Sequence, residues 1–387
     1  MRKKHSSGKN DTRKKTIHIC VINDLVSDQR VHRTALTLIN QGFRVVAIGR
    51  ELPQSCSLNH RPYRIKRFRL PVTKGPFFYA LYNLYLFFYL LFRKTDGILA
   101  NDLDTLPAAF LAAKIRRKTL VYDSHEYFTQ VPELTDRPLT RRIWERIEAT
   151  LLPYVRFAFT VSPSIAEAYN QQYGIQMKVV RNLPEKKSRK QPENKPLSFP
   201  GKQIILYQGA VNKGRGLEKM IQAMHHLENA MFVIIGTGDL MEEMKRLVER
   251  EQLSEKVVFT GRIQPENLPA YTQCATIGVS LEEDIGLNYR FALPNKIFDY
   301  IQAHVPVLVS PLPEMKKIVD KYQVGKVLTD NQPDTIATTI QHLFSGNTLQ
   351  QFQPLLEKAA DEFCWENEQQ ILLDIFREAG WMGTAKS

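Results

Sequence analysis

Residues 279–309 combine three kinds of side chain that could do chemistry together: an acidic run, a glycine and a charged helix start. Pro294 suits the first turn of a helix, which has no partner for the donor that proline lacks, and the apolar spacing after it supplies one buried face. Free backbone N–H groups at such a helix start favour an anion, so a phosphate could rest there. The residues of interest are Glu282, Glu283, Asp284, Gly286, Leu287, Asn288, Asn295, Lys296 and Asp299.

The same stretch has a simpler interpretation. An exposed acidic loop followed by an ordinary amphipathic helix, with Lys296 and Asp299 paired three residues apart, would need no ligand. Short motifs of this kind also occur by chance, so the other features of the chain have to decide between the two interpretations.

Glycine-bearing loops at three predicted strand ends favour a ligand. They read QGAVNKGRG (208–216), IGTGDL (235–240) and TGRI (260–263). Glycine lets the backbone approach a ligand closely, and cationic side chains at a helix start can neutralise a diphosphate. Together the loops predict one anion site at the carboxyl edge of a sheet. The candidate residues are Gly209, Lys213, Arg215, Gly236, Gly238, Arg262 and Ile263.

A chain of 387 residues is more than twice the size of a typical domain, which predicts two domains. Short apolar runs alternate with helical patterns in both halves, as in α/β proteins with parallel sheets. A segment rich in Lys and Pro between them has the composition of a linker. We predict a disordered basic tail at 1–15, an N-terminal Rossmann-like domain at 16–183, a linker at 184–202, a C-terminal Rossmann-like domain at 203–362, and a C-terminal helix and tail at 363–387.

The predicted strands are the short apolar runs between these helical patterns. They lie at 17–22, 45–48, 97–100, 120–122 and 157–161 in the first half, and at 204–207, 232–235, 257–260, 277–279 and 307–309 in the second.

Polar side chains also follow strands of the first half, where ligands of open parallel sheets bind. An imidazole there can donate to a hydroxyl or share charge with a carboxylate, although Asp28 has the simpler role of a helix N-cap. The sequence Asp102-Leu103-Asp104 resembles a metal-binding DxD motif, but a match of three residues arises by chance, so we predict no metal. The candidates on this side are Asp24, Arg30, Asp102, His125 and Glu126.

The formal charge of +13 is concentrated in the first half. Residues 1–183 contain 30 Lys and Arg against 14 Asp and Glu, about +16, which leaves about −3 for the rest. Such a basic face suits an anionic partner, either membrane headgroups or a phosphate-bearing acceptor. The chain has no aromatic RNA-binding motif and no zinc-finger spacing, so we predict no nucleic-acid partner.

The cysteines and the start of the chain bear on location. Cys20, Cys56, Cys274 and Cys364 are isolated from one another, which fits a reducing compartment. The apolar run after the basic tail is too short for the core of a signal peptide. We therefore expect a cytoplasmic protein that can associate with the inner face of a membrane.

Residues 77–94 are unusual because tyrosines and one asparagine interrupt an otherwise apolar run. The run is about sixteen residues long, short of the roughly twenty that a membrane span needs. Two interpretations stay open: a helix at the membrane interface, with residues 61–94 meeting anionic lipid, or a buried helix.

These motifs together resemble the retaining glycosyltransferases of the GT-B fold, specifically family four, the group 1 type. The resemblance is carried by NDLVSDQRVHR, AND followed by YDSHE, YQGAVNKGRGLEKMI, IGTGDL, FTGRI and LPNKIFDYIQAHVPVLVS. It implies two Rossmann-like domains with parallel sheets facing a central cleft and a C-terminal helix that crosses back to the N-terminal domain. It also implies a nucleotide-diphosphate sugar as co-substrate, no further cofactor, and a saccharide or lipid-linked acceptor.

The resemblance also implies roles for individual residues. Arg215 occupies the position of the basic residue that holds the donor diphosphate, where Lys is more usual, and the family's companion arginine is Ala210 here. Lys213 or Lys296 could supply the lost charge. His125 matches the histidine beside the transferred sugar, and the donor-binding set includes Arg262 and Ile263 beside the nucleobase.

The acid pair of the family is only partly present. Asp299 matches the second acid, which binds the ribose, but Phe291 stands where the first is expected. Glu282, Glu283 or Asp284 could replace it if the loop is longer by about eight residues, and we favour Glu283 and Asp284.

Two further functions fit the same sequence. A sugar-nucleotide epimerase can share the two-domain architecture, and it would act on a nucleotide sugar without an acceptor. A non-catalytic partner that binds nucleotide sugars is suggested by Ala210 and Phe291, which depart from the family pattern.

Overall fold

The computed structural model describes residues 14–26, 28–53, 55, 60–135, 137–186 and 196–382. Most of the predicted tail, Cys56 and the middle of the predicted linker lie outside these residues. The chain divides into two compact units. The first unit comprises residues 1–123, 154–157 and 376–387, and the second comprises residues 124–153 and 158–375.

The first sheet has seven strands in the order β3-β2-β1-β4-β5-β6-β7. Neighbouring strands pair in parallel, with Ile17 opposite Val45 on one side and Ile19 opposite Leu99 on the other. The strand order reverses between β1 and β4, which makes that point the topological switch of the sheet. The strands are β1 (Thr16–Cys20), β2 (Arg44–Glu51), β3 (Arg64–Arg69), β4 (Gly97–Asn101), β5 (Thr119–Ser124), β6 (Phe157–Thr160) and β7 (Lys178–Val179).

The second sheet has six strands in the order β10-β9-β8-β11-β12-β13. It too is parallel, and its order reverses between β8 and β11. Its interior is apolar, and β9 is buried along its whole length. The strands are β8 (Gln203–Gln208), β9 (Ala230–Ile235), β10 (Val257–Gly261), β11 (Ile277–Ser280), β12 (Val307–Val309) and β13 (Gly325–Val327).

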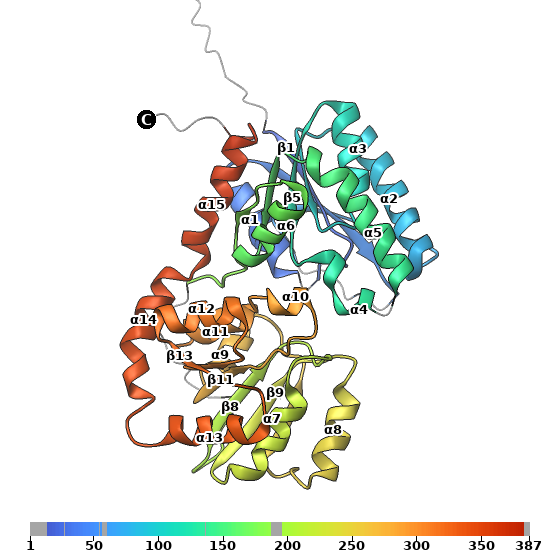
Figure 1. Cartoon of the computed structure of the whole chain (residues 1–387). Coiled ribbons are helices and arrows are strands. Elements are labelled where there is room, and N and C mark those ends of the chain that lie inside the picture. Colours follow the sequence, from blue (N-terminus) through green and yellow to red (C-terminus); the bar gives the residue numbers. More distant parts are fainter. Residues whose placement is uncertain are drawn as a thin grey trace, which may run out of the picture. The chain divides into compact units, whose positions relative to one another are not determined.

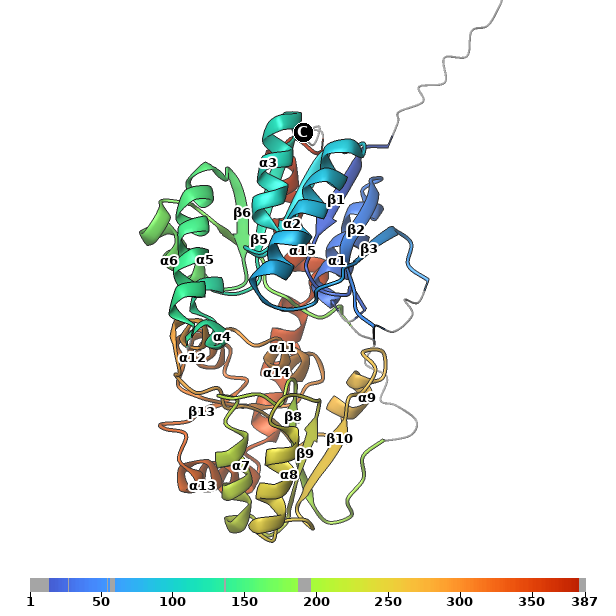
Figure 2. The same ribbon diagram turned by 90° about the vertical axis from the view of Figure 1, so that its right-hand side faces the viewer.

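Helices connect most successive strands by crossovers, which in parallel sheets are right-handed. Figures 1 and 2 show how the helices surround the sheets. The helices of residues 1–186 are α1 (Gln29–Asn40), α2 (Gly75–Phe92), α3 (Leu106–Arg116), α4 (Pro132–Thr135), α5 (Pro138–Leu151) and α6 (Pro163–Tyr173). Those of residues 196–382 are α7 (Leu217–Ala223), α8 (Met241–Arg250), α9 (Leu268–Thr272), α10 (Leu287–Arg290), α11 (Asn295–Gln302), α12 (Pro313–Tyr322), α13 (Pro333–Phe344), α14 (Gln353–Glu362) and α15 (Trp365–Glu378).

The predicted α/β class with two parallel sheets is confirmed. Three strands were not predicted, and each lacks an apolar run. β3 has the sequence RIKRFR and buries only Phe68, β7 has two residues, and β13 has three. A short or charged edge strand carries little hydrophobic signal, because only one side of it meets the core.

The last residues of the described chain belong to the first unit. The indole of Trp381 packs against Gly97 and stacks on Phe376. The Nζ of Lys15 donates to the carbonyl of Trp381 at 2.8 Å. These contacts fasten the end of α15 beside β4 and the start of β1.

Candidate active site

Loops after β8, β9 and β10 form one layer at the carboxyl edge of the second sheet. The N–H of Gly209 donates to the carbonyl of Ile235 at 2.9 Å, and the N–H of Gly236 donates to the carbonyl of Gly261 at 2.9 Å. A Cβ at Gly236, where φ is 145°, would lie 1.8 Å from the carbonyl oxygen of Gly209. Gly236 is therefore required by the packing of the loops on each other, whatever ligand they bind.

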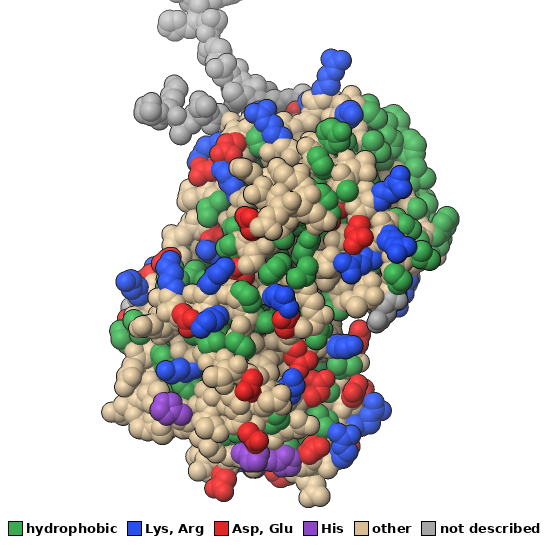
Figure 3. All heavy atoms as spheres, in the orientation of Figure 1, with side chains coloured by type: hydrophobic (Ala, Val, Ile, Leu, Met, Phe, Trp, Pro, Cys, Tyr) green, Lys and Arg blue, Asp and Glu red, His purple; other side chains and the backbone are tan. Residues whose placement is uncertain are grey.

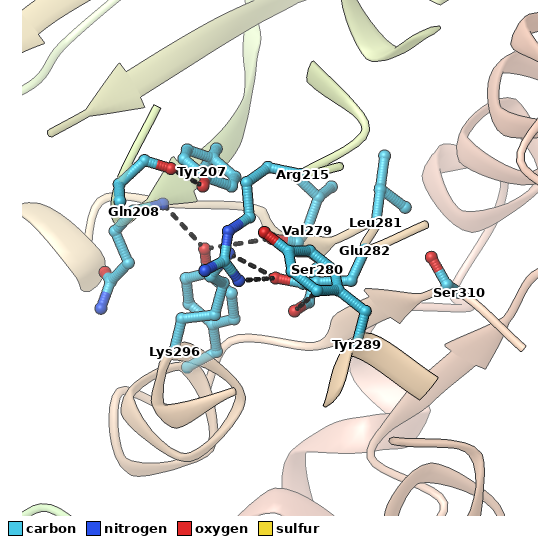
Figure 4. A network of polar contacts seen from close by, with 12 residues as sticks. Tyr207, Gln208, Arg215, Val279, Ser280, Leu281, Glu282, Tyr289, Lys296 and Ser310 are labelled. Carbon is cyan, nitrogen blue, oxygen red and sulfur yellow. Dashed lines mark hydrogen bonds and ion pairs between the residues drawn. The ribbon is translucent and has the colours of Figure 1, made fainter. Parts of the chain in front are cut away.

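Glu282 lies at the centre of a buried polar cluster at the switch point of the same sheet (Figure 4). Its side chain is fully buried, and its Oε1 accepts from the Nζ of Lys296 at 2.8 Å and from Arg215 at 3.4 Å. The hydroxyl of Ser280 donates to its Oε2 at 2.6 Å. Two cations thus share one carboxylate at the place where open parallel sheets bind their ligands.

Aromatic rings hold the two cations in place. The Nζ of Lys296 lies 4.1 Å from the centroid of the Tyr207 ring, and the guanidinium of Arg215 lies 5.0 Å from that of Tyr289. The hydroxyl of Tyr289 donates to the carbonyl of Lys213 at 2.9 Å. The side chain of Lys296 is 8% exposed and that of Arg215 is 28% exposed, so Arg215 is the more open to solvent.

Burial and charge oppose each other in this cluster. Burial favours a neutral Glu282, but Lys296 and Arg215 outweigh it, and the pKa of Glu282 lies below its usual value. Burial lowers the pKa of Lys296, with Arg215 acting in the same direction and Glu282 against it. Burial also acts to lower the pKa of Arg215, yet Glu282 keeps that pKa above its usual value. The carboxylate is ionised, and the cations exceed it in charge.

Arg215 retains hydrogen-bonding capacity for a ligand. Its Nε is buried and has no hydrogen-bond partner within the part of the chain that the structure describes. A buried donor without a partner costs free energy, so an anionic oxygen placed there would be stabilised. The loop that carries Arg215 ends at Gly216, whose φ is 69° and where a Cβ would lie 2.1 Å from the carbonyl oxygen of Leu281.

Asp299 lies on α11, one turn after Lys296. Its Oδ2 accepts from the side-chain amide of Gln208 at 2.8 Å, and the Oε1 of Gln208 accepts from the hydroxyl of Thr272. Gln208 is the last residue of β8, so the hydrogen bond from its amide fixes the Asp299 carboxylate relative to the sheet. The predicted residues Arg215, Lys296, Asp299 and Gly209 are therefore gathered around the ends of β8 and β11.

The favoured acids Glu283 and Asp284 point elsewhere. Glu283 pairs with Lys219 at 2.7 Å, and Asp284 pairs with Arg290 at 2.8 Å, both in partly exposed positions. The acid that joins the cations is Glu282. One signal in the sequence could have found it: side chains two residues apart along an extended chain share a side, and Ser280 and Glu282 do so beside the end of β11.

Asn288 links α10 to residues 126–127 within the second unit. Its side-chain oxygen accepts from the N–H of Tyr127 at 2.9 Å, and its amide donates to the carboxylate of Glu126 at 3.4 Å. His125, next to Glu126, is partly buried. The structure thus brings the predicted residues Glu126 and Asn288 together from distant parts of the sequence.

The remaining predicted donor residues lie around this cluster with fewer contacts. Lys213, Arg262, Gly286, Leu287 and Asn295 are exposed, and Ile263 is partly buried against the core of the second sheet. A Cβ on Gly238 would lie 2.3 Å from the carbonyl oxygen of Val211, so packing alone explains why position 238 is a glycine. Sequence reasoning missed Tyr207, Gln208 and Tyr289, because aromatic and amide side chains at these positions are common in cores.

The candidates of the first unit have partners or backbone conformations within that unit. Arg30 forms a bidentate pair with Asp123, at 2.8 and 2.6 Å, and both side chains are buried. Asp24 accepts from the N–H of Val26, and Asp102 has a positive φ of 59° directly after β4. Asp28 caps α1 by accepting from the N–H of Val31 at 2.8 Å, as the simpler interpretation predicted.

Two protein-family models match the chain. Residues 28–183 match Glycosyltransferase Family 4, and residues 188–359 match Glycosyl transferases group 1. A curated relative is the chitobiosyldiphosphodolichol beta-mannosyltransferase of Mus musculus, with 27% identity over 170 residues, which are 42% of this chain and 34% of that protein. The chain spans less than half the length of the curated relatives that it matches.

Solved structures share the architecture. Sucrose-phosphate synthase from Thermosynechococcus elongatus superposes with a TM-score of 0.77 at 18% identity and covers 95% of this chain and 100% of that chain. The Anabaena protein HepE, solved in complex with UDP and glucose, gives a TM-score of 0.72 at 14% identity, covering 94% of this chain and 100% of that chain. The fold is therefore GT-B, and the two halves of the chain are similar to glycosyltransferase domains of family 4 and group 1.

Proposed function

We propose that this protein transfers a sugar from a nucleoside-diphosphate sugar to a saccharide or lipid-linked acceptor, with retention of configuration, in the assembly of a cell-surface polysaccharide or glycoconjugate. The observation that carries the proposal is the sharing of Glu282 by Lys296 and Arg215 at the switch point of the second sheet. The two glycosyltransferase domains that the chain matches support the same activity.

The charge balance of the cluster suits a diphosphate. Two cations and one carboxylate leave a net positive charge in a mostly buried setting, where electrostatic attraction is stronger than in water. A diphosphate oxygen would complete the hydrogen bonding of Arg215, whose Nε lacks a partner among the described residues. The Gly209 loop lets the backbone approach the same ligand.

Each group then has a role in the donor complex. Arg215 and Lys296 hold the diphosphate, and Asp299, fixed by Gln208, accepts from the ribose hydroxyls. The 260–263 loop faces the nucleobase through Arg262 and Ile263. His125, with Glu126 and Asn288 beside it, contacts the transferred sugar.

In the reaction the bond between the anomeric carbon and the diphosphate oxygen breaks, and that oxygen keeps the electron pair. The acceptor hydroxyl oxygen bonds to the anomeric carbon and passes its proton to an oxygen of the departing diphosphate. Negative charge grows on the departing diphosphate, and fixed cations aimed at it lower the barrier without reorganising. We expect this stabilisation to make a metal unnecessary, so activity should survive treatment with EDTA.

A relative named for a dolichol diphosphate-linked sugar supports an acceptor attached to a lipid. The basic first half of the chain would attract the phosphate of such an acceptor. We therefore propose that the reaction takes place at the cytoplasmic face of a membrane.

Binding of nucleotides tests the diphosphate site directly. We would measure the binding of UDP, GDP and the matching nucleosides by isothermal titration calorimetry. Arg215→Ala should lower the affinity for the diphosphates at least about tenfold and leave the affinity for the nucleosides nearly unchanged. Arg250→Ala, an exposed arginine at the end of α8, is the matched control. Equal loss for nucleoside and diphosphate would place the diphosphate elsewhere.

Product analysis separates the three functions that fit the sequence. Sugar transfer that depends on an acceptor, with the anomeric configuration of the donor kept in the NMR spectrum of the product, supports the proposal. Conversion of the nucleotide sugar without an acceptor indicates an epimerase. Tight nucleotide binding with no turnover across a broad donor and acceptor panel indicates a non-catalytic partner.

A further inference from the structure

Helices α2 and α3 of the first unit present an apolar face to solvent. On α2 the exposed side chains include Phe77, Leu84, Phe88 and Phe92, with exposures from 47% to 77%. The helices lie side by side in Figures 1 and 2, and hydrophobic side chains gather at their edge of the molecule in Figure 3. On α3, Leu111 and Ile115 are 49% and 60% exposed, one helical turn apart.

The opposite face of α2 is docked on the first sheet. Its buried residues recur every four positions at Phe78, Tyr82, Leu86 and Leu90. The hydroxyl of Tyr82 donates to the carbonyl of Val21 at 2.7 Å. By length and composition α2 could cross a membrane. To do so it would have to expose these four buried side chains and break that hydrogen bond, so the folded unit keeps the helix on its surface.

Basic residues border the apolar face on two sides, at the joined ends of α2 and α3 and along β3. Arg93 and Lys94 follow α2, while Lys114 and Arg117 lie at the end of α3, and all four are exposed. Arg116 donates to the carbonyl of Leu90 at 2.7 Å, which places the ends of the two helices together. Strand β3 adds two further exposed cations on the α2 side: Arg64 and Lys66 share one side of the strand with Phe68, whose ring contacts Tyr82, Tyr85 and Tyr89 of α2.

The face has no acidic side chain of its own. Helix α2 contains no charged residue, and the charges of α3 are Lys114 and Arg116. If a second copy of the chain bound through the same face, the cations of the two copies would lie close together and repel each other. A bilayer with anionic headgroups matches both the apolar face and its basic border. Aromatic rings favour the headgroup boundary, and the cations attract the headgroups.

We infer that the face formed by α2 and α3, called here the aromatic face, lies flat on an anionic lipid bilayer. From Phe77 to Phe92 the contact runs about 22 Å along the helix axis. The aromatic and aliphatic side chains enter the headgroup boundary, and the basic border contacts lipid phosphates. This surface narrows the predicted membrane contact of residues 61–94 and adds α3, and it does not depend on which reaction the protein catalyses.

Flotation of the full-length protein with vesicles tests the inference without any sugar donor. The vesicles are phosphatidylcholine alone, or phosphatidylcholine with phosphatidylglycerol. We expect binding to the anionic vesicles, reduced at least about tenfold by Phe88→Ser with Phe92→Ser. Leu139→Ser with Ile143→Ser on α5, equally exposed but outside the aromatic face, should leave binding unchanged. Lys94→Glu with Lys114→Glu should remove the preference for anionic lipid.

Three results would overturn the inference. They are absence of binding to either vesicle, binding that the Phe88/Phe92 variant leaves intact, and a dimer in light scattering that the same variant abolishes. These exposed substitutions should leave the midpoint of thermal unfolding nearly unchanged, which a thermal melt verifies. For the wild-type protein, binding that weakens with added salt supports the basic border.

Discussion

The two units each contain a buried ion pair next to a strand end, and the pairs differ in one respect. In the first unit Arg30 and Asp123 meet one to one, with both carboxylate oxygens bonded and side chains 5% and 1% exposed. In the second, Glu282 serves both Lys296 and Arg215. The first pair is balanced in charge, whereas the second has a cation to spare.

This difference explains why burial of charge alone does not identify an anion site. A balanced buried pair recovers its desolvation cost within the protein and offers nothing to a ligand. A cluster with excess positive charge, in which one cation is 28% exposed, is stabilised when an anion binds to it. The contrast can be tested from both sides.

Breaking the balanced pair should have the largest effect. Asp123→Ala leaves Arg30 buried without its carboxylate, so we expect urea unfolding to show a loss of about 3–5 kcal/mol in the free energy of unfolding. The double variant Arg30→Met with Asp123→Leu removes both charges and should recover much of that loss. If the double variant is as unstable as Asp123→Ala, the loss of stability does not come from leaving Arg30 buried without its carboxylate.

Removing a cation from the open cluster should act on turnover. Lys296→Ala should lower kcat/KM for sugar transfer by about 10²–10³-fold, because charge on the leaving diphosphate loses a fixed partner. Lys245→Ala is the matched control: it removes a lysine that pairs with Glu242 at the same 2.8 Å but in an exposed position. Equal effects of the two substitutions would contradict the assignment.

Another buried carboxylate, Glu148, has hydroxyl neighbours and, among the described residues, no cation bonded to it. Thr129, Tyr169 and Tyr173 donate to it, yet burial dominates and raises its pKa to about 7. The folded protein therefore holds a proton that the unfolded chain releases near pH 4.5, and stability should fall as pH rises from about 4.5 to 7. Unfolding curves across that range should show a loss of about 3 kcal/mol, which Glu148→Gln largely removes. Stability of the wild type that rises over the same range would contradict this assignment.

The smallest expected effect concerns competition within the cluster. Glu282→Gln keeps the shape but removes the charge that Lys296 and Arg215 share. Affinity for UDP or GDP should then rise about threefold to tenfold in titration calorimetry, because the diphosphate no longer competes with a carboxylate. Weaker binding would instead mean that Glu282 positions the cations for the ligand.

Much of the fold was predictable because buried parallel strands are apolar runs. The run at 307–309 coincides with β12, and 204–207 lies within β8. Strand β3 was not predictable, because its charged side chains alternate at a sheet edge and resemble a basic surface segment. Helix boundaries followed the Pro and Gly signals, as at Pro163 and Gly174 of α6.

The candidate site was predictable as a neighbourhood but not in its contacts. Strand ends and glycines located the loops. The resemblance to a known family implied the roles of Arg215 and Asp299 from their positions in its motifs. Which of the three acids after β11 turns inward depends on the path of the loop, and local sequence does not encode that path. The pairing of Lys296 with Glu282 joins residues fourteen positions apart and requires the tertiary structure.

The glycine loops after β8, β9 and β10 have a consequence for engineering donor choice. Their hydrogen bonds continue the spacing of the strands, and a Cβ at Gly236 has no room beside Gly209. Lengthening one loop would shift its neighbours as a group, so insertions should be tolerated poorly there. Under the proposed function, selectivity for a different nucleotide is better sought through exposed side chains such as Arg262, which can change without moving the backbone beneath them.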